Sequence, residues 1–464
     1  MGNPEHGAEG RGASPRNSLN ETHTATARAI VIVPVLTRQP RGEDDSASAR
    51  PRLGRSPEAR RDEAVGLALA IDVEVVHTAI VTVAEPRPAT LIGSGKVEEF
   101  AAIVAETKAE LVIVDHPLTP VQQRNLEKAL NAKVLDRTGL ILEIFGRRAR
   151  TKEGVLQVDL AHLNYQKGRL VRSWTHLERQ RGGAGFLGGP GETQIEADRR
   201  VLQDKIIKLK RELETVRRTR DLHRAKRKKV PFPVVAIVGY TNAGKSTLFN
   251  RLTGAGVLAE DMLFATLDPT LRRVRLPNGT IIILSDTVGF ISDLPTHLVA
   301  AFRATLEEVV EADLVIHLRD IADPDTAAQA EDVERILGDL EIDASDRKRV
   351  IEVWNKIDLL APEARATLLE EREQEQDRPV AVSAVTGEGI DHLSAIVEER
   401  IAGALEPMTV VLRPDQQGHL DWLYKNANVV RRVDEEDGSV RFDLQVTATA
   451  RADVESRLSK KNAG

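Results

Sequence analysis

The sequence contains no cysteine, and this absence removes several kinds of chemistry at once. Disulfides, thiol nucleophiles, iron–sulfur clusters and thiolate zinc sites all require cysteine. Long apolar runs are also missing, since none approaches the roughly 20 residues that span a bilayer. The N-terminal stretch is polar and lacks the apolar core of a signal peptide. We therefore expect a cytoplasmic protein without stable membrane insertion.

The chain has no strong overall charge, because 65 Lys and Arg face 71 Asp and Glu, a net of −6. The charge is nevertheless uneven. Residues 147–229 contain 23 basic and 10 acidic residues, a net of +13 that leaves −19 for the rest of the chain. A basic segment on an acidic protein is typical of a polyanionic partner, although a solvated helical face has the same composition.

The segment that follows the polar N-terminus alternates between short apolar runs and amphipathic stretches. The predicted elements are strands at 30–33, 73–83 and 111–115 and helices at 97–109 and 121–130. Strands that alternate with helices favour a small parallel α/β unit. Residues 1–28 are too polar to bury a core, and we expect them to be disordered. The polar stretch 38–61 is predicted to be a loop or a continuation of that disorder.

Two long helical patterns with heptad-like apolar spacing come next. The apolar positions are Leu156, Leu160, Leu163, Leu170, Trp174 and Leu177 in the first, and Leu202, Ile206, Leu209, Leu213 and Val216 in the second. Between them, Gly182–Gly191 contains six glycines in ten residues. Helices of this kind pair as an antiparallel hairpin. Exposed Phe186 and Leu187 at its tip indicate either a probe that inserts into a partner or an ordinary long loop.

An apolar run of strand length, 234–238, leads directly into Gly239–Ser246, which fits the P-loop pattern G-x-x-x-x-G-K-[ST]. In a P-loop the backbone N–H groups surround the β-phosphate, and a lysine, here Lys245, lies between the β- and γ-phosphates. The hydroxyl of Ser246 is a hard oxygen ligand for Mg²⁺. The residues assigned to triphosphate binding are Gly239, Tyr240, Thr241, Asn242, Ala243, Gly244, Lys245, Ser246 and Thr247.

A second buried strand, predicted at 281–285, ends in a D-x-x-G sequence made of Asp286, Thr287, Val288 and Gly289. The acidic residue of this motif holds Mg²⁺ through water, and the backbone N–H of its glycine meets the γ-phosphate. A segment between the two motifs offers a threonine to complete the Mg²⁺ shell; it consists of Phe264, Ala265, Thr266, Leu267 and Asp268. Thr266 is preferred over Thr270. The predicted catalytic residues are Lys245, Thr266 and Gly289, and the predicted direct metal ligands are Ser246 and Thr266.

The base is specified by Asn355, Lys356, Ile357 and Asp358, which follow a strand predicted at 350–353. The Asp358 carboxylate can accept hydrogen bonds from N1–H and N2–H₂ of guanine, and adenine offers no such pair of donors. The Lys356 stem would lie over the base plane. Ser383, Ala384 and Val385 fit the loop whose backbone N–H meets guanine O6. Four ordered motifs at strand ends predict a domain that binds GTP and GDP.

One position departs from the common GTPase pattern. Many GTPases have a glutamine directly after the D-x-x-G glycine to orient the attacking water, and here that residue is Phe290. Since Phe290 can neither donate nor accept a hydrogen bond, we expect slow hydrolysis until a partner completes the site. Asn242 could hold a monovalent cation such as K⁺ beside the phosphates.

With these motifs the chain resembles the HflX family of GTPases, from about Ile30 to the C-terminus. The resemblance is carried by Leu91–Lys96, Asp136-Arg137-Thr138, Arg148–Gly154, Leu156-Gln157-Val158, Trp174–Leu177, Gly189–Gln194, the P-loop and Phe264–Thr270. The Gly-Pro-Gly-Glu-Thr-Gln sequence at 189–194 together with this P-loop is specific to the family.

The resemblance implies a ribosome-associated GTPase that binds the large subunit with GTP, and several members separate stalled 70S ribosomes under stress. The hairpin would then enter the intersubunit face, with its tip toward the peptidyl transferase centre. Its basic residues would contact rRNA phosphates, and Phe186 could pack on unstacked bases. The large subunit would activate hydrolysis. Two alternatives stay open: a large-subunit assembly factor, and an RNA-binding module that uses GTP only as a conformational ligand.

The predicted fold class is a multidomain α/β protein in which a small α/β domain and an antiparallel helical hairpin precede a P-loop GTPase domain. A small α+β domain follows it. The predicted boundaries are a disordered extension at 1–28, the N-terminal α/β domain at 29–150, the hairpin at 151–230, the GTPase domain at 231–406 and the C-terminal domain at 407–464. We expect a monomer that is cytoplasmic and partly ribosome-bound.

Overall fold

The computed structural model of the chain describes most of the sequence. The described residues are 26–37, 55–180, 190–227, 232–254, 263–264, 266–267, 269–292, 303–374, 379–403, 406–435, 437–446 and 448–459. Residues 1–25 of the predicted extension, residues 181–189 of the predicted hairpin tip, Ala265 and Asp268 lie outside these ranges. Arg28, the last residue assigned to the extension, already belongs to the first strand.

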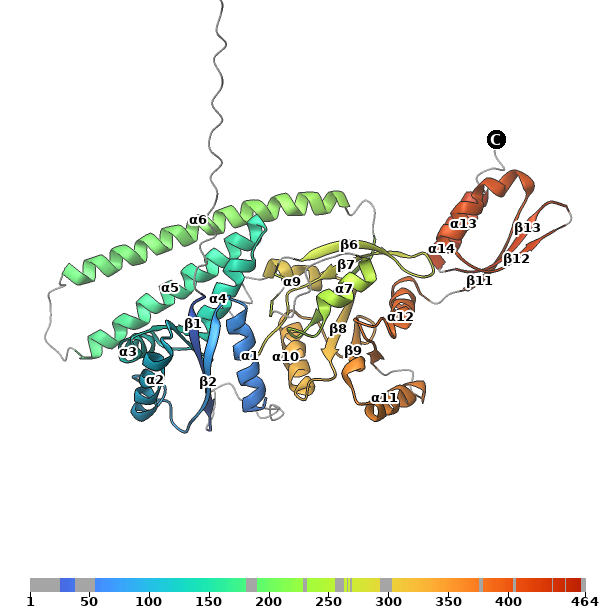
Figure 1. The fold of residues 1–464 in the computed structure, drawn as a ribbon. Coiled ribbons are helices and arrows are strands. Elements are labelled where there is room, and N and C mark those ends of the chain that lie inside the picture. The colour runs from blue at the N-terminus through green and yellow to red at the C-terminus, as the bar shows by residue number, and fades with distance from the viewer. Residues whose placement is uncertain are drawn as a thin grey trace, which may run out of the picture.

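The N-terminal part is a four-stranded parallel sheet with helices on both faces (Figure 1). Its strands are β1 (Arg28–Leu36), β2 (Glu74–Val83), β3 (Leu111–Val114) and β4 (Lys133–Asp136), in the order β2-β1-β3-β4. Its helices are α1 (Pro57–Leu69), α2 (Ser94–Thr107), α3 (Pro120–Leu130) and α4 (Arg137–Arg148). Apolar residues of β1 alternate between a core with α2 and α3 and a core with α1 and α4. This confirms the predicted parallel α/β unit.

Helix α1 corrects the prediction of a loop through residue 61. The Ser56 hydroxyl accepts a hydrogen bond from the Ala59 N–H (3.1 Å), and Pro57 stands in the first turn, so the helix starts with a strong N-terminal signal. The helix was missed because its buried face is made mainly of small residues between charged ones, which weakens the apolar period. Strand β4 and helix α4 were likewise not predicted.

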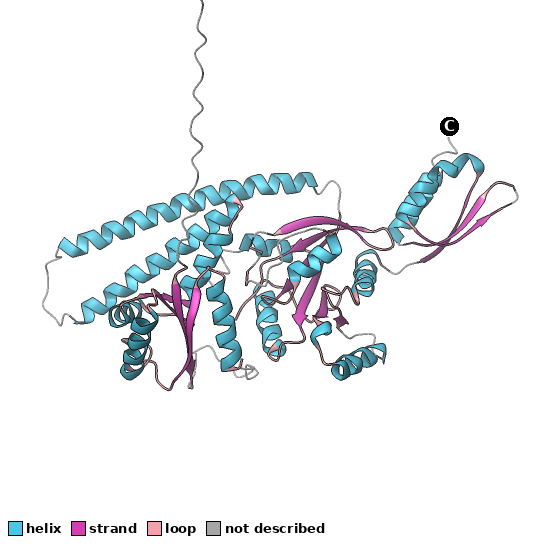
Figure 2. Cartoon of the chain, viewed as in Figure 1, coloured by secondary structure: helices cyan, strands magenta, loops and turns pink. Residues whose placement is uncertain are grey.

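Helices α5 (Lys152–Gln180) and α6 (Pro190–Arg227) form a long antiparallel pair that extends along one side of the molecule (Figure 2). Leu156 of α5 and Ile206 and Leu213 of α6 are buried, as the heptad-like spacing predicted. The next predicted positions on α5, Leu160 and Leu163, are half-buried. A hydrogen bond from Lys167 Nζ to Gln203 Oε1 (2.5 Å) also joins the two helices.

The central part is a six-stranded sheet in the order β10-β9-β8-β5-β7-β6, in which β6 is antiparallel to β7 and the other neighbours are parallel. The strands are β5 (Val234–Gly239), β6 (Thr270–Arg275), β7 (Ile281–Asp286), β8 (Leu314–Asp320), β9 (Val350–Asn355) and β10 (Val380–Ala381). The helices are α7 (Lys245–Thr253), α9 (Arg303–Val310), α10 (Thr326–Asp339), α11 (Pro362–Gln374) and α12 (Ile390–Ala402). Helices α7 and α12 cover one face, and α9 and α10 cover the other.

The C-terminal part is a three-stranded antiparallel sheet in the order β11-β13-β12, with its own apolar core. It consists of β11 (Glu406–Leu412), α13 (Leu420–Asn426), β12 (Asn428–Asp434), β13 (Val440–Val446) and α14 (Ala448–Ser459). This mixture of strands and helices agrees with the small α+β domain predicted at the C-terminal end, whereas the five domain boundaries themselves stay predictions. Among the described helices, none is long and apolar enough to cross a membrane.

The first two sheets share one apolar core. Residues of α1 and α4, including Leu67 and Phe145, belong to the same buried cluster as Phe264, Phe290 and Ile291 of the central part. Phe145 and Phe264 stack edge to face with ring centroids 4.7 Å apart. The N-terminal part therefore packs directly against the segments that were predicted to surround a nucleotide.

Candidate functional site

The P-loop connects β5 to α7 at the carboxyl edge of the central sheet, where the N-terminus of α7 can bind phosphate. Gly244 has a φ of 91°, and a Cβ there would collide with Asn355 Nδ2, so both backbone conformation and space require glycine. The Lys245 Nζ donates to the Tyr240 carbonyl (2.7 Å). Burial lowers the pKa of Lys245 to about 8. A buried, weakly paired cation is thus ready for an anionic ligand.

Three oxygen-bearing side chains gather beside the P-loop. Ser246 Oγ and Thr266 Oγ1 both donate to Asp286 Oδ2, at 2.8 and 2.9 Å, and the two hydroxyl oxygens lie 3.0 Å apart. The other oxygen of Asp286, Oδ1, is buried without a hydrogen-bond partner among the described residues, and burial raises the pKa of this carboxyl. Thr270, the competing threonine, is the first residue of β6 and stands opposite Asp286 in the register of β6 and β7, but it is the hydroxyl of Thr266 that donates to the Asp286 carboxylate. The oxygens are of the kind that Mg²⁺ prefers.

Gly289 brings the segment after β7 against the P-loop. A Cβ on Gly289 would lie 2.9 Å from Thr241 Cγ2 and 3.0 Å from Lys245 Nζ. The next residue, Phe290, is fixed by its backbone, because its N–H donates to the Gly239 carbonyl (3.1 Å) and its carbonyl accepts from the Thr241 N–H (2.7 Å). The ring of Phe290 is 1% exposed and belongs to the core shared with the N-terminal part. The position that carries glutamine in many GTPases therefore faces the protein interior.

The base-recognition loops are joined by Asn355. Its Nδ2 donates to the Ala243 carbonyl (2.8 Å), and its Oδ1 accepts from the Ala384 N–H (2.9 Å). Within the loop that was predicted to meet guanine O6, the Ala384 N–H is thus held by Asn355. Lys356 Nζ lies 2.7 Å from Asp320 Oδ2. Asp358 is half-buried, in the 3₁₀ turn Ile357–Leu359 that follows β9.

Several residues predicted to bind nucleotide have side chains that lie elsewhere. Phe264, Leu267, Val288 and Ile357 are buried, and Thr287 Oγ1 donates to the Ile237 carbonyl (2.6 Å). Tyr240 lies in the P-loop, but its hydroxyl points toward the N-terminal part. Val385 is 67% exposed, and its carbonyl accepts from Arg251. The buried residues among these could contact the ligand only through their backbones. Gly239, Asn242 and Thr247 lie on the P-loop and the first turn of α7, as predicted.

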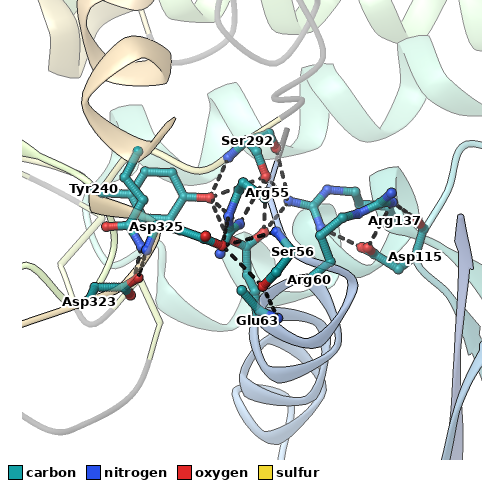
Figure 3. A network of polar contacts seen from close by, with 12 residues as sticks. Arg55, Ser56, Arg60, Glu63, Asp115, Arg137, Tyr240, Ser292, Asp323 and Asp325 are labelled. Atoms are coloured by element: carbon teal, nitrogen blue, oxygen red, sulfur yellow. Dashed lines mark hydrogen bonds and ion pairs between the residues drawn. The ribbon is translucent and has the colours of Figure 1, made fainter. Parts of the chain in front are cut away.

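A buried polar network, which sequence reasoning missed, lies directly behind the P-loop (Figure 3). Its members are Arg55, Glu63, Asp115, Arg137, Tyr240 and Ser292. Although burial opposes ionisation, Arg137 and Arg55 hold the pKa of Glu63 below its ordinary value. Burial, together with the Glu63 carboxylate, raises the pKa of Tyr240 well above its ordinary value, so its hydroxyl stays protonated. The one sequence signal was the Asp136-Arg137-Thr138 motif, to which no role had been given.

Four family models match the chain in order. They are described as GTP-binding GTPase N-terminal (58–146), GTP-binding GTPase middle region (148–227), 50S ribosome-binding GTPase (234–356) and HflX C-terminal domain (368–463).

Curated relatives match over most of their length. GTPase HflX of Magnetococcus marinus is 50% identical over 418 residues, which covers 90% of this chain and 92% of the relative. GTPase HflX of Escherichia coli is 47% identical over 362 residues, covering 78% and 83% respectively. A crystal structure of a GTP-binding protein from Sulfolobus solfataricus in complex with GDP aligns with 81% of this chain and 98% of its own, at 22% identity and a TM-score of 0.42.

Proposed function

The chain belongs to the HflX family of GTPases, and from that premise we propose that it hydrolyses GTP on the large ribosomal subunit and thereby splits stalled or idle 70S ribosomes. One observation carries the proposal. The side chains of Ser246, Thr266 and Asp286 lie together beside the P-loop, whereas Phe290 is turned into the core and offers nothing to orient water. A GTPase of this kind hydrolyses slowly until a partner supplies the missing group.

The oxygens of Ser246, Thr266 and Asp286 support a Mg²⁺ site. The two hydroxyls would be direct ligands, and the Asp286 carboxylate would act through water. Bound there, Mg²⁺ would neutralise charge that develops on the β- and γ-phosphates. Lys245 would hold its proton at Nζ against the same phosphates, and Gly289 would offer its backbone N–H to the γ-phosphate.

Asn242 supports a monovalent cation beside the phosphates. It is exposed on the P-loop with a φ of 60°, so its carboxamide can face a ligand rather than the interior. We propose K⁺ as that cation, because a carboxamide oxygen is a hard ligand. Hydrolysis that is equally fast in potassium and sodium buffers would contradict this assignment.

The hairpin α5/α6 supports a contact with rRNA. Lys205, Lys208, Lys210, Arg211 and Arg218 are exposed on α6, and cations spaced along a helix bind phosphates without regard to sequence. The hairpin projects beyond the N-terminal sheet (Figure 1). We propose that it enters between the subunits, with its tip at residues 182–191 directed toward the peptidyl transferase region.

The decisive experiment is steady-state GTP hydrolysis with and without purified 50S subunits, in potassium buffer, followed by sedimentation of 70S ribosomes with excess protein and GTP. We expect at least tenfold stimulation and a loss of the 70S peak. A deletion of residues 182–189 should spare GTP binding and abolish splitting.

Replacing exposed lysines of α6 tests the contact with rRNA without disturbing the buried core. The triple variant Lys205→Gln, Lys208→Gln, Lys210→Gln should weaken 50S binding and flatten its salt dependence. The matched control, Lys96→Gln with Lys108→Gln, removes exposed lysines of the N-terminal part and should leave 50S binding unchanged. Absence of stimulation by 50S subunits, or an intact 70S peak, would overturn the proposal. Accumulation of immature large subunits on depletion would instead favour an assembly factor.

A further inference from the structure

Asp136 and Arg137 stand where β4 runs into α4, and neither is among the residues predicted to bind nucleotide. Both side chains are buried, at 2% and 5% exposure. Although they are adjacent in sequence, they contact different parts of the protein. Asp136 contacts the hairpin, and Arg137 contacts the segment that begins with the D-x-x-G sequence (residues 286–292, here called the D-x-x-G segment).

Asp136 fixes α5 at one point. Its Oδ1 accepts from the Tyr165 hydroxyl (2.5 Å) and from the Gly139 N–H (2.8 Å), and its Oδ2 accepts from Arg169 Nη2 (2.7 Å). Tyr165 and Arg169 lie one turn apart on α5, and the guanidinium stands 4.3 Å from the Tyr165 ring centroid. Burial raises the pKa of Tyr165, so its hydroxyl stays a donor. The α5 helix is therefore held by a buried charge at the end of β4.

Arg137 fixes the D-x-x-G segment from the other side. Its Nη2 donates to the Ser292 carbonyl (2.9 Å) and to Glu63 Oε1 (2.5 Å), and its Nη1 pairs with Asp115. The Ser292 N–H donates to the Tyr240 hydroxyl (2.8 Å), which in turn donates to Glu63. Both backbone groups of Ser292 are thus held by one network (Figure 3).

We propose that Asp136 and Arg137 form a connection through which the position of α5 sets the position of the D-x-x-G segment, with Arg137 as a positioning residue for GTP hydrolysis. Adjacent Cα atoms are about 3.8 Å apart across a planar peptide, so Asp136 cannot shift with α5 without moving Arg137. Arg137 carries the movement to Ser292, three residues after Gly289. The event that moves α5 is ribosome engagement by the hairpin, and in this respect the inference rests on the proposed function.

The connection itself is tested without ribosomes, by hydrogen–deuterium exchange of the full chain bound to a non-hydrolysable GTP analogue. Tyr165→Phe removes one hydroxyl that donates to Asp136 and leaves the ring in place. We expect peptides covering 287–292 to exchange at least fivefold faster in this variant. Tyr424→Phe, in the C-terminal part, is the matched control and should match the wild type. Equal exchange at 287–292 in Tyr165→Phe and wild type would overturn the connection.

The role of the connection in GTP hydrolysis is tested by measuring hydrolysis in the presence of 50S subunits. Arg137→Lys keeps the charge but loses the planar fork that reaches Ser292 and Glu63 together. We expect kcat with 50S to fall at least fivefold while the nucleotide Kd stays within twofold. Arg147→Lys is the control, because Arg147 lies on the same helix in an exposed pair with Asp72. Tyr165→Phe should lower the stimulation and leave cosedimentation with 50S unchanged.

The two arms separate the two claims. A ratio of stimulated to unstimulated hydrolysis equal to wild type in both Tyr165→Phe and Arg137→Lys would overturn the role of the connection in hydrolysis. A wild type that 50S subunits do not stimulate would overturn the proposed function, and the exchange measurement would still decide whether α5 and the D-x-x-G segment are linked.

Discussion

The N-terminal sheet is parallel and the central sheet is mainly parallel, and the carboxyl edges of the two use buried charge in opposite ways. At the N-terminal sheet, Asp115 and Arg137 meet opposite charges, and Glu63 on α1 joins them. At the central sheet, Lys245 and Asp286 are buried as well, and Asp286 Oδ1 and Thr241 Oγ1 lack hydrogen-bond partners among the described residues. Arg137 lacks such a partner at Nε, but both of its Nη atoms are paired with carboxylates. Ligands of α/β proteins bind at this edge. In this molecule, one edge is prepared for a ligand, and the other is closed by a neighbouring domain.

The difference shows in the pKa values. Arginines hold the pKa of Glu63 below its ordinary value even though burial opposes this, whereas burial prevails at Lys245 and Asp286 and disfavours their charged forms. A group that already has its partner stabilises the fold. A group whose partner is absent costs stability until the ligand binds. Substitutions at the two edges should therefore affect different measurements.

The largest effect is expected at the closed edge. Glu63→Gln leaves Arg55 and Arg137 buried without their carboxylate, and should cost about 3–5 kcal/mol in the free energy of unfolding, measured by urea denaturation. Because the pKa of Glu63 lies below its ordinary value of 4.5, the contribution is present above that pH and is lost as pH falls through the folded-state pKa. Glu99→Gln, in an exposed pair with Lys96, is the control and should change stability by less than about 1 kcal/mol. An equal loss of unfolding free energy in Glu63→Gln and Glu99→Gln would show that the buried charges of this edge do not stabilise the fold.

At the open edge, Lys245→Ala should weaken GTP binding by about 2–4 kcal/mol, because a charge-assisted contact with the phosphates is lost. The folded state should be no less stable, since a desolvated charge is removed. Titration with a fluorescent GTP analogue measures the first effect, and urea denaturation measures the second. Lys96→Ala serves as the control. Unchanged affinity in Lys245→Ala would show that the P-loop assignment is wrong.

Base selection should change by a smaller amount. Asp358→Asn replaces an acceptor of two guanine N–H groups by a side chain that accepts and donates, and should reduce the preference for GTP over xanthosine triphosphate by about 1–3 kcal/mol. Competition binding with the two nucleotides measures the preference. Asp391→Asn, at an exposed position of α12, is the control. Retained guanine selectivity would contradict the role of Asp358.

The smallest of the four effects should be the change of GTP affinity with pH, measured over one pH unit. The pKa of Lys245 is lowered to about 8 in the nucleotide-free protein, and bound phosphates favour the ammonium and raise it. GTP affinity should therefore be flat below about pH 8 and fall by about tenfold per pH unit above it, a change of about 1.4 kcal/mol. Affinity that stays constant up to pH 9.5 would show that Lys245 is not the titrating group.

The sequence predicted the central part of the molecule in most detail. The P-loop, the D-x-x-G sequence and the Asn355–Asp358 motif each follow a strand, and the structure brings their residues to one sheet edge. Such motifs are readable because a few adjacent residues carry the whole geometry. Ser246 and Thr266 belong to separate segments, yet the sequence assigned both to one metal ion, and the structure places their hydroxyl oxygens 3.0 Å apart. The hydrogen bonds of both hydroxyls to the same oxygen of Asp286 became visible only in the fold.

Prediction failed where local signals were weak or partners distant. Helix α1 was missed because its buried face consists mainly of small residues. Its Glu63 contacts Tyr240, which lies far along the chain. The position of Tyr240 in the P-loop predicted a ligand contact, whereas packing turned its hydroxyl toward Glu63 of the N-terminal part. The sequence predicted that Phe290 cannot form the hydrogen bond that glutamine forms in many GTPases. It did not predict that the Phe290 ring packs in the core shared with the N-terminal part.

By itself, then, the sequence determined the nucleotide motifs, the alternation of strands and helices, and the basic hairpin, because each depends on residues close along the chain. The tertiary structure alone decided how the N-terminal and central parts share a core, and which buried charges find a partner. Those outcomes depend on desolvation and on contacts between distant segments, which no local pattern records.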